Sequence, residues 1–184
     1  MQKEIDNFRE KNFKGRDARL IKEWEMIERR YANDNQAEYI IRKRNGMGLP
    51  VVYDIVFNIK SITGVENPDE NGLKKPVFGN QHIMRITLPN NYPSADGLPE
   101  FKFTTDIWHP NIQHFGDFKG LVCLNQRDSG TQTNLIEYID RVIAYLTYED
   151  YHAINEYPNP QDLTVAEWVL EQGEPQGWVE FEQE

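Results

Sequence analysis

Apolar residues recur at helical spacing near the start of the chain. Leu20, Trp24, Ile27 and Tyr31 follow one another at steps of four, three and four, which places them on one face of an α-helix. We predict a helix over residues 17–31 that packs this face against a sheet, preceded by turn-rich chain. The opposite face carries a set of basic residues that we expect to face solvent: Arg16, Arg19, Lys22, Arg29 and Arg30.

Alternating patterns follow the helix and predict strands. Apolar and more polar residues alternate over residues 53–60, which indicates a half-buried strand with one polar face. Shorter strands are predicted at residues 38–43, 84–88 and 101–103, whereas residues 64–79, rich in Gly, Pro, Asn and charge, predict a long loop. A helix followed by a four-stranded meander favours an α+β fold with an antiparallel sheet.

A second helix is predicted from Asn134. This asparagine is a good N-cap with Glu137 three residues on. A stripe of apolar residues follows at helical spacing: Leu135, Ile139, Val142 and Leu146. We therefore expect this helix to bury one face.

A third helix is predicted near the end of the chain. Thr164 to Glu167 reads as a capping box, Trp168 and Val169 would face inward, and Gly173 would close the helix. We expect a single domain over residues 1–173 and an acidic tail over residues 174–184.

Composition restricts the possible partners. The formal net charge of −10 repels phosphate backbones and anionic lipids, so a protein partner is favoured over nucleic acid or a membrane. The chain has no apolar run of membrane-spanning length and no signal-peptide pattern, so we expect a cytoplasmic protein. One cysteine excludes an internal disulfide.

That cysteine, Cys123, is the main candidate for chemistry. A lone cysteine more often fills a core than reacts. Here Gly120 permits a tight bend before it and polar residues 125–130 follow it, so we interpret the sulfur as exposed. Asn111, twelve positions earlier, supplies a carboxamide. A thiol and a fixed amide donor suit acyl transfer through a thioester, because the thiolate attacks the carbonyl and the amide N–H receives the charge on oxygen.

Other chemistries fit the residues less well. Cys123 and the four histidines lack the close ligand spacing of zinc motifs, so we predict no metal site. A cysteine-protease arrangement of His109, Asn111 and Cys123 is compatible with residue order but not with a papain-type context. There is no phosphate-cradling Gly-rich loop or Rossmann fingerprint, and we predict no cofactor.

Four motifs occur in a fixed order between residues 91 and 125. They are Tyr92-Pro93, Pro99-Glu100-Phe101-Lys102-Phe103, His109-Pro110-Asn111-Ile112 and Gly120-Leu121-Val122-Cys123-Leu124. In this order they resemble the ubiquitin-conjugating enzymes. The resemblance implies that family's α+β fold, with an N-terminal helix, a four-stranded antiparallel meander, an active-site loop and C-terminal helices.

The chain also departs from the family pattern. The Asn111–Cys123 spacing is longer than usual, with the additional residues within 113–119, and the loop at residues 64–79 is long. The long loop, the absence of the Trp-Ser-Pro usual after the cysteine and the acidic tail in place of a further helix suggest a divergent bacterial branch. Members of that branch serve ubiquitin-like conjugation and often lie in anti-phage operons.

The resemblance implies a role for each matching residue. Cys123 would accept the C-terminus of a ubiquitin-like protein as a thioester from an ATP-using activating enzyme, which docks on the first helix. It would then pass this acyl group to a lysine of a target protein, with Asn111 stabilising the oxyanion. The active-site loop would be shaped by His109, Pro110, Ile112 and Asn125.

Asp162, in an Asn-Pro-x-Asp stretch, would help the attacking amine. Alternatively, Asp162 is simply an acidic residue favoured at the start of a helix. Asn111 likewise has a structural alternative, in which its side chain bonds its own backbone to form a turn. A non-catalytic module of the same fold that binds ubiquitin-like proteins is the main competing function. A cysteine hydrolase is less favoured.

Overall fold

The computed structural model describes residues 2–32, 34–124 and 133–183. The helices are α1 (Gln2–Arg9), α2 (Gly15–Tyr31), α4 (Leu135–Leu146), α5 (Leu163–Trp168) and the π-helical segment η1 (Val169–Gly173). The strands are β1 (Ala37–Arg44), β2 (Pro50–Phe57), β3 (Ser61–Val65), β4 (Pro76–Gly79), β5 (His82–Thr87) and β6 (Glu100–Phe103). Within these ranges, every helix is too short or too polar to cross a membrane.

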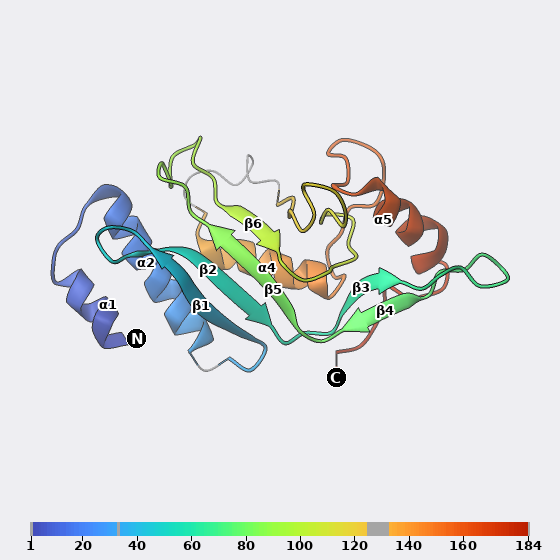
Figure 1. The fold of residues 1–184 in the computed structure, drawn as a ribbon, viewed down its shortest axis with the longest axis horizontal. Coiled ribbons are helices and arrows are strands. Elements are labelled where there is room, and N and C mark those ends of the chain that lie inside the picture. The colour runs from blue at the N-terminus through green and yellow to red at the C-terminus, as the bar shows by residue number, and fades with distance from the viewer. Residues whose placement is uncertain (1, 33, 125–132, 184) are drawn as a thin grey trace.

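The main sheet has four antiparallel strands in the order β1-β2-β5-β6, which confirms the predicted meander. Between β2 and β5 the chain forms a separate two-stranded ribbon, β3–β4, which extends beyond the end of the main sheet (Figure 1). The prediction of a loop over residues 64–79 therefore holds for residues 66–75 and is wrong at both ends, which belong to β3 and β4. Its turn residues form only the tip of the ribbon, where Asp69 Oδ1 accepts hydrogen bonds from two backbone N–H groups at 2.8 and 2.9 Å.

The start of the chain also differs from the prediction. Residues expected to be turn-rich form α1, because Ile5 and Phe8 give it an apolar face that packs on α2. The Phe8 and Trp24 rings lie 6.0 Å apart. On α2 itself, the predicted stripe from Leu20 to Tyr31 is buried against the sheet, as expected.

The face of β2 that was predicted to be polar and exposed is buried. Asp54 and Val56 are buried, as are the apolar residues of the opposite face. Asp54 accepts hydrogen bonds from Arg42 at 2.6 Å and from Arg85 at 2.8 Å. Burial by itself raises the pKa of Asp54, but the two guanidinium groups outweigh it and hold that pKa below its ordinary value.

Helix α4 begins as predicted. The Asn134 side chain accepts a hydrogen bond from Glu137 N at 3.1 Å, and the predicted stripe of four apolar residues is buried. The Tyr138 ring lies 5.2 Å from Phe101 of β6, so α4 packs across the sheet.

The third predicted helix exists, but its cap is different. Asp162, not Thr164, is the N-cap residue, and its Oδ1 accepts a hydrogen bond from Val165 N at 3.2 Å. Trp168 and Val169 are buried and η1 ends at Gly173, as predicted.

Residues 174–183, predicted as part of an acidic tail, pack on a second apolar cluster. Val179 is buried there, and the Phe181 ring lies 5.1 Å from Phe78 of β4. The Gln183 side chain forms hydrogen bonds with both the backbone N (2.9 Å) and O (3.0 Å) of Lys60. This segment therefore contributes to the packing around β3, β4 and α5.

We expect Val179→Ala to lower the free energy of unfolding by about 2 kcal/mol, from roughly 0.8 kcal/mol per buried methylene plus the cavity left behind. Chemical denaturation measures this difference. Glu180→Ala is the matched control, because Glu180 is exposed and its loss should change stability by less than about 0.5 kcal/mol. Equal stabilities for Val179→Ala and the control would contradict the packing of this segment.

Candidate active site

Cys123 and Asn111 lie on opposite arms of a narrow hairpin. Cys123 N donates to Asn111 O at 2.8 Å, and Gln113 N donates to Leu121 O at 3.0 Å. Gly120 N donates to Gln113 O at 2.6 Å, which closes the turn beyond them. The additional residues within 113–119 therefore lie at the tip of the hairpin and do not separate Asn111 from Cys123.

The hairpin directs alternate side chains to opposite faces. Ile112 and Val122, which pair across the arms, are buried in the main core. Their neighbours Asn111, Gln113 and Cys123 therefore leave on the other face, where Cys123 is half-buried. Gly120 is required here, because its φ is +84° and a Cβ would lie 2.1 Å from Phe103 O.

The Asn111 side chain is held in one orientation. It is only 6 % exposed, and its Oδ1 accepts a hydrogen bond from His152 N at 3.0 Å. Its Nδ2 group has no hydrogen-bond partner among the described residues. The amide donor thus remains available to an oxygen atom that approaches the hairpin.

His109 is a neutral, fully buried part of the loop. Its Nδ1 accepts a hydrogen bond from Asn111 N at 3.1 Å, and its Nε2 donates to Asp150 O at 3.2 Å. Burial lowers the pKa of His109 to about 3, and the bond to the Asp150 carbonyl offsets this only in part. Both ring nitrogens are engaged, so His109 cannot pair with Cys123 as a base at neutral pH.

Tyr145 is a site residue that the sequence did not reveal. Its hydroxyl donates to Cys123 O at 3.2 Å, and its ring stacks on His109 at 4.8 Å. It therefore contacts both the cysteine backbone and the histidine that supports Asn111. Helical spacing marks Tyr145 as buried on α4, but no local signal connects it to Cys123.

Asp162 is buried, and both of its carboxylate oxygens accept hydrogen bonds. While Oδ1 caps α5, Oδ2 accepts hydrogen bonds from Gln113 Nε2 at 3.2 Å, His114 N at 2.8 Å and His114 Nδ1 at 2.6 Å. Asp162 N also donates to Pro110 O at 2.9 Å. This geometry favours the helix-capping interpretation of Asp162 over direct contact with an amine. Asn125, predicted beside the cysteine, lies outside the described residues.

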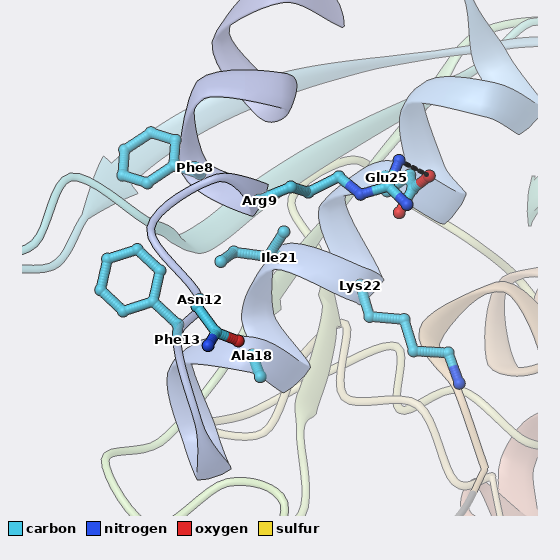
Figure 2. A pocket seen from close by; sticks show the side chains of 8 residues that line it. All are labelled: Phe8, Arg9, Asn12, Phe13, Ala18, Ile21, Lys22 and Glu25. Atoms are coloured by element: carbon cyan, nitrogen blue, oxygen red, sulfur yellow. Dashed lines mark hydrogen bonds and ion pairs between the residues drawn. The ribbon is translucent and has the colours of Figure 1, made fainter.

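A pocket of about 220 Å³ lies between the end of α1, the residues that follow it and α2 (Figure 2). Phe8, Phe13 and Ile21 line it, and Arg9 at its rim pairs with Glu25 at 3.3 Å. Lys22, from the predicted basic face, also lines this pocket.

Arg19, on the same basic face, was predicted to face solvent, and this prediction is wrong. Its guanidinium group pairs at 2.6 Å with the buried Glu23 carboxylate.

Comparison with known proteins supports the fold. No family model matches the chain. A putative ubiquitin-conjugating enzyme of Plasmodium yoelii shares 25 % identity and a TM-score of 0.57, over 91 % of this chain and 92 % of that one. The E2 domain of a Toxoplasma gondii ubiquitin-conjugating enzyme has a TM-score of 0.54 at 23 % identity, over 89 % and 90 % of the two chains.

A curated sequence points the same way. The Arabidopsis thaliana protein named probable ubiquitin-conjugating enzyme E2 31 is 32 % identical over 93 residues. The match covers 50 % of this chain and 51 % of that protein, so the chain spans about half the length of the curated relative. The chain therefore has the ubiquitin-conjugating α+β fold.

The buried imidazole predicts a specific acid sensitivity. Unfolded histidine takes up a proton near pH 6.5, whereas folded His109 does so only near pH 3, so the unfolded state binds more protons between these values. Stability is thus fully present above about pH 6.5 and falls on acidification, by up to about 1.4 kcal/mol per pH unit from this group.

We expect His109→Gln to lose stability less steeply than the wild type in urea titrations at about pH 7, 6 and 5. His82 is also buried with a lowered pKa, but it contributes equally to both proteins. Parallel pH profiles would show that His109 does not carry this effect.

Proposed function

We propose that this chain is a conjugating enzyme for a ubiquitin-like protein, with Cys123 as the acyl carrier. The pairing of Cys123 with Asn111 across the hairpin carries this proposal. Cys123 is half-buried, and Asn111 Nδ2 has no hydrogen-bond partner among the described residues, which supports acyl transfer at this hairpin. The fold and the curated relative support the same class of reaction.

In the first transfer, the Cys123 thiolate attacks the thioester carbonyl presented by the activating enzyme. A C–S bond to Cys123 forms, and the C–S bond to the activating enzyme breaks. One thioester replaces another, so the step needs no strong base. ATP is consumed by the activating enzyme, and this chain needs no cofactor or metal of its own.

In the second transfer, a lysine amine of the target protein attacks the thioester on Cys123. Negative charge develops on the carbonyl oxygen, and Asn111 Nδ2 is the group we assign to stabilise it. His109 supports this arrangement by accepting the hydrogen bond from Asn111 N, while Pro110 and Ile112 fix the loop beside it.

The activating enzyme is proposed to dock on α2, as in the family that the chain resembles. The exposed part of its basic face, with the adjoining pocket beside Lys22, is the surface we assign to it. A bacterial origin and an anti-phage role remain proposals that rest on the departures in sequence. Genome neighbourhood would test them, through adjacent genes for an activating enzyme, a ubiquitin-like protein and a peptidase.

A cysteine hydrolase is disfavoured, because both nitrogens of His109 bind the backbone and its pKa is far below neutrality. A non-catalytic binding module would bind a ubiquitin-like protein without forming a covalent bond. The gel assay below separates this alternative from an enzyme.

With ubiquitin, its activating enzyme and ATP as the first probe, the protein should form an adduct that thiol reductant removes on a gel. Other ubiquitin-like proteins, each with its own activating enzyme, extend the panel. Cys123→Ser should give a band that resists reductant, because an oxygen ester replaces the thioester, and Cys123→Ala should give none. An adduct on Cys123→Ala would overturn the assignment of the acyl carrier.

Asn111→Asp tests the oxyanion role by keeping the acceptor for His152 N and removing the amide donor. We expect thioester formation at the wild-type level and discharge to lysine slower by about 100-fold, the typical effect of losing one oxyanion donor. Single-turnover discharge measures this rate. Asn111→Ala, which loses the acceptor as well, should show the same defect together with a lower melting temperature. If Asn111→Asp discharges to lysine at the wild-type rate, Asn111 is excluded as the oxyanion donor.

A further inference from the structure

The insertion at the tip of the hairpin places a histidine on a buried carboxylate. His114 donates to Asp162 Oδ2 twice, from its backbone N at 2.8 Å and from Nδ1 at 2.6 Å. The Asp162 side chain is fully buried, whereas that of His114 is 25 % exposed. The pair therefore has one member anchored in the protein and one member at the surface.

The contacts determine which nitrogen of His114 is available. Because Nδ1 carries the proton donated to Asp162, Nε2 of the neutral ring carries the lone pair. Nε2 has no hydrogen-bond partner within the described part of the chain. The ring is held by Trp108 and Phe115, whose centroids lie 4.6 and 4.8 Å from it. Of the side chains that contact the ring, Asp162 is charged, whereas Trp108 and Phe115 are uncharged.

The pair is bonded to the hairpin arm that carries Asn111. Gln113 leaves the hairpin on the same face as Asn111 and Cys123, and its Nε2 reaches the same Asp162 oxygen that binds His114. Asp162 N is also bonded to Pro110 O, next to Asn111. The His114–Asp162 pair is therefore attached to the hairpin arm that carries Asn111, opposite the arm that carries Cys123.

We propose that His114 is the general base that deprotonates the attacking amine, with Asp162 as the positioning residue that orients it. This inference rests on the proposed function. It assigns to an inserted histidine the proton transfer that the sequence suggested for Asp162. A carboxylate that orients an imidazole and stabilises the imidazolium is the arrangement found in hydrolytic triads.

The proton and bond changes balance as follows. The lysine ammonium gives one proton to His114 Nε2, and the neutral amine attacks the carbonyl carbon. The C–N bond forms, the C–S bond breaks, and the sulfur of Cys123 leaves with the electron pair. The amide nitrogen loses a second proton to that thiolate, and the His114 imidazolium returns its proton to water.

His152 provides a matched control. It also lies beside Asn111, to which it donates from its backbone N at 3.0 Å. Its ring Nε2 contacts Glu156 O at 3.2 Å, and no carboxylate orients it within the described residues. Replacing this ring by glutamine leaves the backbone bond to Asn111 in place.

The test compares two nucleophiles on the ubiquitin thioester of Cys123. Free lysine must lose a proton near neutral pH, whereas hydroxylamine is already neutral. At pH 7, His114→Gln should slow discharge to lysine by on the order of 100-fold and leave discharge to hydroxylamine unchanged. His152→Gln should change neither rate. The deficit of His114→Gln should shrink as the pH approaches the lysine pKa of about 10.4.

Equal losses for lysine and hydroxylamine, or no loss for either, would overturn the base assignment. The wild-type protein gives a second test that needs no variant. With a base, the ratio of lysine to hydroxylamine rates should rise more slowly with pH than the fraction of neutral lysine does. A continued rise of about tenfold per pH unit toward the lysine pKa would exclude a base. Failure to form the thioester at all would instead refute the proposed function.

Discussion

The geometry of the candidate site depends on one backbone hydrogen bond, from Cys123 N to Asn111 O. It keeps the two residues opposite each other on a hairpin whose other face is anchored by Ile112 and Val122. Extra residues at the tip of such a hairpin cost little, because loop-closure entropy rises slowly with length. The insertion can therefore bring new side chains to the site without moving the two residues proposed to act there.

Buried carboxylates connect the elements of this acidic chain. Glu23 of α2 accepts hydrogen bonds from Arg19 (2.6 Å), Tyr92 Oη (2.6 Å) and Leu135 N (2.9 Å), which ties α2 to the start of α4. Asp54 holds β1 and β5 to β2 in the same way, and Asp162 holds the insertion to α5. Removing the partners of a buried charge is costly, by about 3–5 kcal/mol, so such contacts define which elements meet.

The active-site loop lies between two apolar clusters. Ile107 and Ile112 belong to the core under the main sheet, whereas Trp108 packs on the cluster formed by the ribbon, α5 and residues 174–183. Tyr148 of the second cluster donates to Trp108 O and contacts the His109 ring at 4.8 Å. The ribbon and the C-terminal segment therefore belong to the cluster on which this part of the loop packs.

The sequence by itself determined the elements whose cause is local. Alternation and helical spacing predicted the meander, α2 and the buried stripe of α4, and the order of four motifs indicated the fold and the segment that carries Cys123 and Asn111. Only the tertiary structure decided the features that join distant residues. Asp162 contacts His114, 48 positions away in the sequence, and Tyr145 contacts Cys123, 22 positions away. Hydrophobic periodicity carries no information about such pairs. The ribbon, α1 and the packed C-terminal segment escaped prediction for the same physical reason, since each is stabilised by a surface elsewhere in the chain.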